Sequence, residues 1–254
     1  MPVTIKSARE IELMAEAGRI LEIVHNELRD ALHAGMSTLD IDRLGEEIIR
    51  SYDCIPSFLN YNGYPASICV SLNQEVVHGI PDKHRLIQDG DIVSLDAGVI
   101  YKGYHSDAAR TYGVGEISKE AKNLMQITKE CFFEGIKYAR EGNHLFDISG
   151  AIGRYAEERG YGVVRDLCGH GIGTALHEAP EIPNYEVGRK GVKLRPGMTL
   201  AIEPMINIGT HEVDWLDDDW TVVTRDGSLS AHYENTILIT EGEPRILSLT
   251  CDNE

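Results

Sequence analysis

The sequence has 254 residues, of which 42% are hydrophobic and 26% charged, a composition typical of a globular protein. Asp and Glu outnumber Lys and Arg by 41 to 24, so the net charge is −17. This acidic net charge argues against a protein whose whole surface is basic and binds nucleic acid. It also supplies carboxylates that can bind hard cations. No apolar run approaches the roughly 20 residues that a membrane span needs, and no signal peptide is expected at the N-terminus. The 5 cysteines form no CxxC pair, so we expect free thiols and a cytoplasmic protein.

The predicted elements fall into two similar series along the chain. A capping box at Ser7 and Glu10 opens an apolar run at helical spacing, which Gly35 ends. The first series comprises this helix, a second helix from 37–40 to Tyr52, and strands at 66–72 and 91–113. The second series comprises helices at 118–140 and 144–159, and strands at 198–206, 220–224 and 231–240.

Short motifs also recur in the same order in the two series. Gly35-x-x-x-Leu39-Asp40-Ile41 is echoed by Gly142-x-x-x-Phe146-Asp147-Ile148, His78-Gly79-Ile80 by His170-Gly171-Ile172, the Gly90 and Asp96 pair by Gly197 and Glu203, and His105-x-Asp107 by His232-x-Glu234. The echoes predict an internal duplication, with halves of about 1–117 and 118–254 in a single domain, 1–254. Duplicated halves usually meet across a pseudo-twofold axis, so equivalent groups should converge on one cleft: Asp96, Asp107, His170, Glu203 and Glu234.

The acidic members of this set need a cation. Asp96 and Asp107 lie on a predicted hairpin that turns near 101–103, and their spacing leaves both carboxylates on the same face of the sheet. Like charges on one buried face are costly unless a cation lies between them. Glu203 and Glu234 lie in otherwise apolar strands and have the same requirement. Carboxylates with one or two histidines suit one or two hard or borderline divalent ions, and two ions about 3.5–4 Å apart are a familiar hydrolytic arrangement.

The stretch CGHGIGTALHEAP (168–180) holds two histidines, His170 and His177. The glycines around His170 predict a tight turn, which leaves this histidine as a turn cap or a metal ligand; its place in the duplication favours the ligand. The sequence after His177 is not HExxH, because Pro180 breaks a helix. Neither a GxSxG elbow nor a GxGxxG or GxxxxGK[ST] loop occurs, so a serine hydrolase is not expected and nucleotide binding has no motif behind it.

In this order the residues resemble the metal ligands of the pita-bread metallopeptidases, and most closely the type I methionine aminopeptidases. The resemblance covers nearly the whole chain. It implies an α+β fold of two pseudo-symmetric halves, with antiparallel sheet covered by helices. Only 32 residues separate His170 from Glu203, too few for the helical insertion of type II enzymes, which indicates the short bacterial form. The supporting stretches are FLNYNGYPASICVSLNQEVVHGIP (58–81), DGDIVSLDAG (89–98), CGHGIGTALHE (168–178), GMTLAIEPM (197–205) and DDDWTVVTRDGSLSAHYENTILIT (217–240).

The resemblance implies metal-dependent removal of the N-terminal methionine from nascent proteins and peptides whose second residue is small. It implies two divalent ions (Co, Mn, Fe or Zn). Asp96 would chelate one ion, Asp107 and Glu234 would bridge the pair, and His170 and Glu203 would hold the other. The implied catalytic residues are Glu203 as general base, His78 at the substrate amide and His177 as a hydrogen-bond donor to the scissile carbonyl. The positions that line the methionine pocket are Phe58, Tyr61, Tyr64, Cys69 and Trp220.

Three positions depart from the family pattern, and two other functions stay open. Leu167, Thr174 and Leu176 stand where Met or an aromatic residue, Arg and Phe are frequent, which affects the cleft wall near His177. The first alternative is a proline-specific aminopeptidase or dipeptidase of the same fold, and the second is a non-catalytic binding protein. We expect a monomer that acts on peptide and nascent-chain N-termini and contacts the ribosome transiently, with no membrane partner.

Overall fold

The structure, a computed structural model, describes residues 3–249, so Cys251 and the extreme ends of the expected domain lie outside the described residues. The helices are α1 (Ala8–Ala31), α2 (Thr38–Ser51), α3 (Lys119–Ile136) and α4 (Leu145–Glu157), with a short 3-10 helix, η1 (Tyr61–Gly63). The strands are β1 (Ile55–Pro56), β2 (Ile68–Leu72), β3 (Glu75–Val77), β4 (Ile92–Tyr101), β5 (Tyr104–Gly113), β6 (Gly162–Val163), β7 (Gly169–Gly171), β8 (Glu178–Ile182), β9 (Thr199–Ile202), β10 (Met205–Asn207), β11 (Val213–Trp215), β12 (Val222–Thr224), β13 (Ser230–His232), β14 (Asn235–Leu238) and β15 (Arg245–Ile246).

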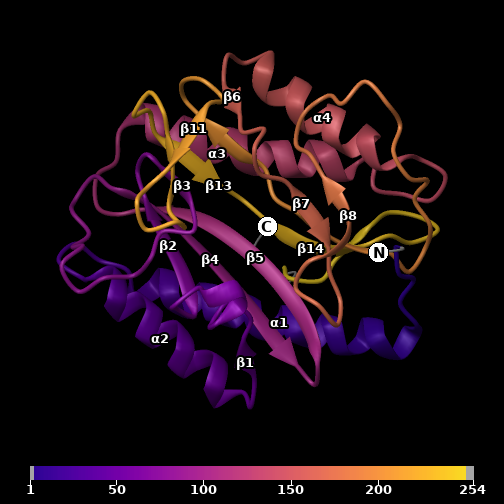
Figure 1. Cartoon of the computed structure of the whole chain (residues 1–254), viewed down its shortest axis with the longest axis horizontal. Coiled ribbons are helices and arrows are strands. Elements are labelled where there is room, and N and C mark those ends of the chain that lie inside the picture. The colour runs from indigo at the N-terminus through magenta and orange to yellow at the C-terminus, as the bar shows by residue number, and fades with distance from the viewer. Residues whose placement is uncertain (1–2, 250–254) are drawn as a thin grey trace.

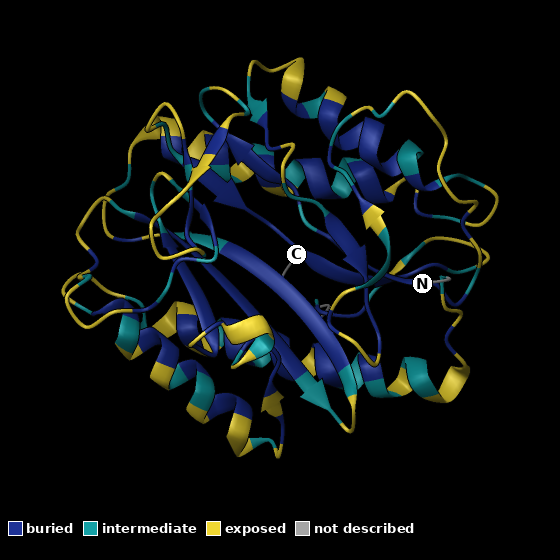
Figure 2. Ribbon diagram, in the orientation of Figure 1, coloured by how far each residue is buried: buried dark blue, intermediate teal, exposed yellow. Residues whose placement is uncertain are grey.

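The strands form antiparallel sheets that the helices cover, so the expected α+β class is confirmed. In the first sheet β4 pairs with β5 and also with β1 and β2. The largest sheet has the order β15-β14-β9-β7-β8, and two smaller sheets have the orders β13-β10-β6 and β11-β12-β3. Figure 1 shows α1 and α2 against the β4–β5 sheet and α3 and α4 on the opposite side of the molecule. In Figure 2 the long strands are buried, while the outer helix faces are exposed.

The helices begin where their caps predict. The Ser7 hydroxyl accepts a hydrogen bond from the N–H of Glu10, whose carboxylate accepts one in return from the N–H of Ser7. The inner face of α1 is buried, as its apolar spacing predicts. The two helices expected at 118–140 and 144–159 are both found but are shorter, ending at Ile136 and Glu157. No helix within residues 3–249 is long and apolar enough to cross a membrane.

Two of the expected strands are broken. The segment 198–206 divides into β9 and β10, which belong to different sheets, and 231–240 divides into β13 and β14. The first break falls at Glu203 and Pro204, and proline has no N–H to continue a ladder. The second break falls at Tyr233 and Glu234. Both glutamates predicted for the site therefore lie at interruptions, where the backbone leaves one sheet for another.

Two threonine hydroxyls join the halves of the molecule. The Thr236 hydroxyl accepts a hydrogen bond from the N–H of Asp107 and donates one to its carbonyl, both at 2.9 Å. The Thr111 hydroxyl accepts from the N–H of His232 at 3.0 Å and donates to its carbonyl at 2.9 Å. These contacts hold β5 beside β13 and β14, and so bring Asp107 next to Glu234. The single domain of 1–254 and its internal duplication, with halves of about 1–117 and 118–254, stay predictions.

Candidate active site

A cavity of about 200 Å³ is lined by residues from both halves of the chain. Every residue predicted for the site contributes to its wall. Leu167 and Leu176, two of the three departures from the family pattern, also line it, but Thr174 does not. The predicted residues are Phe58, Tyr61, Tyr64, Cys69, His78, Asp96, Asp107, His170, His177, Glu203, Trp220 and Glu234. Lining residues that the sequence did not single out are Asn62, Val77, Cys168 and Met205.

The β4–β5 hairpin places two of the carboxylates. Lys102 and Gly103 form its two-residue turn. Asp96 pairs with Ala109, and Asp107 pairs with Gly98, so the two acids are diagonal neighbours on one face of the sheet rather than direct partners. Both side chains are at most 9% exposed, so water screens the repulsion between their charges only weakly.

His170 lies in strand β7, and the glycines on either side of it do not form the tight turn that was expected. A Cβ at Gly169 would lie 2.4 Å from the carbonyl oxygen of Ala201, and one at Gly171 would lie 2.2 Å from that of Ala179. The glycines are therefore required by the close approach of β8 and β9. The Nδ1 of His170 lies 2.9 Å from the Gly171 carbonyl, which can only accept, so Nδ1 carries the proton and Nε2 keeps its lone pair.

The free Nε2 of His170 points at carboxylates. It lies 3.8 Å from Oδ2 of Asp107 and 3.6 Å from Oε1 of Glu203. Ligand atoms of His170, Asp107 and Glu234 all lie within 4.8 Å of one another. This spacing suits a group of side chains that share a cation.

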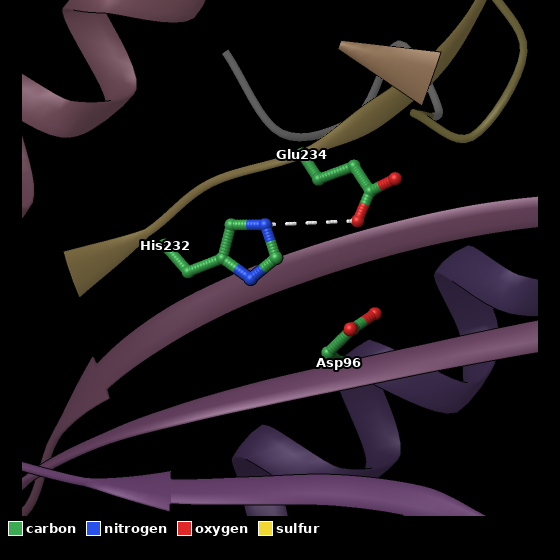
Figure 3. A group of neighbouring side chains, drawn as sticks. All are labelled: Asp96, His232 and Glu234. Atoms are coloured by element: carbon green, nitrogen blue, oxygen red, sulfur yellow. Dashed lines mark ion pairs between the residues drawn. The ribbon is translucent and has the colours of Figure 1, made fainter. Parts of the chain in front are cut away.

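A second histidine, which the sequence analysis did not place in the site, lies on the other side of the same carboxylates. His232 is 2% exposed, and its Nε2 lies 3.8 Å from Oε2 of Glu234 and 4.0 Å from Oε2 of Glu203. Figure 3 shows its ring and the Glu234 carboxylate turned toward each other, with Asp96 nearby on its own strand. The one trace of this arrangement in the sequence is the spacing His232-x-Glu234.

Burial favours the neutral form of the acids in the cluster, so their ionised form depends on nearby positive charge. Burial raises the pKa of Asp96 to about 7, and it raises the pKa values of Asp107, Glu203 and Glu234 well above their usual range. Burial lowers the pKa of His170 to about 3, so this ring is neutral. Within residues 3–249, one oxygen each of Asp96, Asp107 and Glu234 is buried without a hydrogen-bond partner. Unpaired buried carboxylate oxygens beside a neutral imidazole fit divalent cations, which would favour the ionised acids.

Two further histidines border the cluster. His177 stacks edge-on against His170 with ring centroids 4.2 Å apart, and its Nδ1 lies 2.7 Å from the Tyr61 hydroxyl. Burial lowers the pKa of His177. His78 has a φ of 60°, in the left-handed region that is costly for a residue with a Cβ, and its ring meets that of Trp220 at 6.3 Å. These positions put both imidazoles on the wall of the cavity rather than in the carboxylate cluster.

Comparisons with known proteins agree with this geometry. The family model "Metallopeptidase family M24" matches residues 12–241. The methionine aminopeptidase of Clostridium acetobutylicum is 54% identical over 247 residues, which are 97% of this chain and 99% of that protein. The crystal structure of methionine aminopeptidase from Thermotoga maritima superposes with a TM-score of 0.96 at 44% identity, covering 98% of this chain and all of that one. The Xaa-Pro dipeptidase of Bacillus anthracis has the same fold, at a TM-score of 0.77 and 26% identity, but this chain covers only 62% of it. The chain therefore belongs to metallopeptidase family M24, with its pita-bread fold, and within that family to the methionine aminopeptidases.

Proposed function

We propose that this protein hydrolyses the peptide bond after an N-terminal methionine when the second residue is small. The observation that carries the proposal is the cavity where an apolar pocket adjoins a cluster of buried carboxylates with unpaired oxygens. The near full-length similarity to methionine aminopeptidases supports it. This chain covers only 62% of the Xaa-Pro dipeptidase, which does not favour the proline-specific alternative. All five expected metal ligands line the cavity, which does not favour a non-catalytic protein.

The proposed cation site is the cluster of buried carboxylates. Asp96, Asp107, His170, Glu203 and Glu234 would hold two divalent ions. When bound, such ions polarise the scissile carbonyl and lower the pKa of water by several units. The identity of the ions follows from their supply in the cell as much as from the ligand set, and Co, Mn, Fe and Zn all suit oxygen and imidazole donors.

Glu203 is the proposed general base. One of its oxygens lies 3.6 Å from His170 and the other 4.0 Å from His232, and its side chain is 13% exposed at the cavity wall. It would take a proton from the attacking water and pass it to the leaving amine. A positioned base of this kind contributes roughly 10²–10⁴-fold to a rate.

His177 and His78 would contact the peptide itself. When the Tyr61 hydroxyl donates its hydrogen bond to Nδ1 of His177, a neutral ring carries its proton on Nε2. That N–H would donate to the scissile carbonyl oxygen as negative charge develops there. His78, on the same wall, would contact the substrate amide and assist the proton transfer.

The methionine side chain would occupy the apolar end of the cavity. Tyr64 is anchored there by a hydrogen bond from its hydroxyl to the carbonyl of Gly79, at 3.0 Å, and its ring packs edge-on against Trp220 at 5.1 Å. Phe58 and Cys69, both buried, complete this end of the wall. Aromatic faces and a thiol are soft, polarisable partners for a thioether. Leu167 and Leu176 also line the cavity and would affect which second residue it accepts.

The test is release of free methionine from peptides. Apo protein is reconstituted with Mn, Co, Fe or Zn and given Met-Ala-Ser, Leu-Ala-Ser, Met-Pro and an X-Pro dipeptide. We expect release from Met-Ala-Ser and not from Leu-Ala-Ser, and we expect the Glu203→Ala variant and chelator-treated protein to be inactive. Release from the X-Pro substrate alone would establish the proline-specific alternative. No release with any ion would refute the enzyme assignment.

The cellular setting of the reaction is part of the proposal. Nascent-chain N-termini in the cytoplasm are the macromolecular form of this substrate, and a monomer with a transient ribosome contact would reach them. Light scattering tests the monomer, and co-sedimentation with ribosomes tests the contact.

A further inference from the structure

Within residues 3–249, the side chain of His232 is buried without a hydrogen-bond partner. Among the described residues, neither of its ring nitrogens makes a hydrogen bond, although the residue is only 2% exposed. Buried polar groups are paired in most native structures, so an unpaired ring calls for a ligand that the protein atoms do not supply. The main chain of His232 is fixed, because the Thr111 hydroxyl binds both its N–H and its carbonyl. The close packing around the side chain, which is 2% exposed, leaves the ring little room to turn toward another partner.

The distances around the ring match those between ligands of one ion. Nε2 of His232 lies 3.8 Å from Oε2 of Glu234 and 4.0 Å from Oε2 of Glu203, too far for hydrogen bonds. Two donors that each bind a divalent ion at about 2.0–2.2 Å lie roughly 3–4 Å apart. Ligand atoms of Asp96, His232 and Glu234 all fall within 4.8 Å of one another, as Figure 3 shows for the side chains.

A histidine two residues before an acid does not always lie in a metal-ligand group, as His105 shows. It stands two residues before Asp107, as His232 stands two before Glu234, and it is also buried. Its Nδ1 lies 3.0 Å from the hydroxyl of Ser57, and it belongs to neither of the metal-ligand groups found within residues 3–249. Among the described residues, His105 thus has a hydrogen-bond partner for its ring, whereas His232 has none.

We propose that Nε2 of His232 is a metal ligand, which it shares with Asp96 and Glu234. Each of the two cation subsites then contains one imidazole: His170 with Asp107, Glu203 and Glu234 in one, and His232 with Asp96 and Glu234 in the other. The inference rests on the proposed function, since it assumes that the carboxylate cluster holds two divalent ions. A nitrogen donor in the Asp96 subsite shifts its preference from oxygen-seeking Mn²⁺ toward Co²⁺, Fe²⁺ and Zn²⁺.

The first test needs no variant. Wild-type protein is loaded with two equivalents of Co²⁺ and studied by X-ray absorption, which counts imidazoles through their multiple scattering. We expect an average of one imidazole per ion. Half an imidazole per ion, or a chain that takes up only one Co²⁺, would overturn the proposal.

The second test measures affinity in variants whose folding is checked by circular dichroism. In His232→Gln we expect one of the two Co²⁺ ions to bind at least ~100-fold more weakly, beyond the roughly 10–100-fold cost of losing a side chain that only supports a ligand. The matched control, His105→Gln, is expected to bind both ions as wild type does. Equal Co²⁺ affinities in wild type and His232→Gln would overturn the inference. A wild-type protein that binds two Co²⁺ ions but releases no methionine would instead refute the proposed function, so the two failures are distinct.

Discussion

Replacing Thr236 with valine measures how much one of the two threonine hydroxyls contributes to joining the halves of the molecule. Thr236 is fully buried, and its hydroxyl makes two hydrogen bonds to the main chain of Asp107. Valine has nearly the same shape but can make neither bond. The substitution leaves the N–H and the carbonyl of Asp107 unpaired in a site that water does not reach.

The expected cost follows from these contacts. A hydrogen bond contributes about 1 kcal/mol net, and an orphaned buried donor or acceptor costs roughly 1–3 kcal/mol. We therefore expect Thr236→Val to lower the free energy of unfolding by about 2–4 kcal/mol. For a chain of this size each kcal/mol moves the melting temperature by about 2–4 °C, so the midpoint should fall by roughly 4–16 °C.

The assay is urea and thermal unfolding of metal-free protein, because bound ions would add their own stabilisation. Thr128→Val is the matched control: Thr128 is equally buried, but its hydroxyl only donates to the carbonyl of Leu124, one turn back in the same helix. We expect this control to lose less than about 1 kcal/mol. If Thr236→Val were as stable as wild type, or no less stable than Thr128→Val, the hydroxyl would not be joining the halves.

Three further predictions concern pH, metal removal and packing. His25 is buried, with Nε2 donating to the carbonyl of Ala108 at 2.8 Å, and burial lowers its pKa to about 3. As the pH falls below about 6.5, the unfolded chain therefore binds a proton at His25 before the folded chain does. In urea titrations between pH 6.5 and 5.5, the free energy of unfolding of wild type relative to His25→Gln should fall by up to about 1.4 kcal/mol per pH unit. A difference that does not change with pH would contradict this. Adding Co²⁺ to EDTA-treated protein at 100 times the Kd of the tighter site should stabilise it by about 2.7 kcal/mol from that ion alone, or roughly 5–11 °C, and an unchanged melting temperature would argue against a cation site. Gly171→Ala should unfold more than about 2 kcal/mol more easily, because its Cβ would meet the Ala179 carbonyl oxygen at 2.2 Å, whereas Gly242→Ala, with open space around it, should match wild type in the same assay.

The sequence by itself determined the local elements and the chemical types at the site. The capping box at Ser7 and the apolar spacing behind it produce α1, and the tight turn at Lys102 and Gly103 produces the β4–β5 hairpin, because these features depend on neighbours a few residues apart. Buried acids at spaced positions in apolar strands pointed to cations, since few other arrangements make such acids tolerable. The order of the ligands was then enough to indicate the family.

Tertiary structure decided which of these side chains meet and how. The strand rather than turn at His170 and the entry of His232 into the cluster both depend on partners distant in the chain. His105 and His232 have the same spacing from an acid, yet the ring of His105 bonds to the Ser57 hydroxyl, whereas that of His232 lies in a metal-ligand group of the described residues. Short sequence patterns cannot predict such contacts, because these form only when both halves have folded against each other.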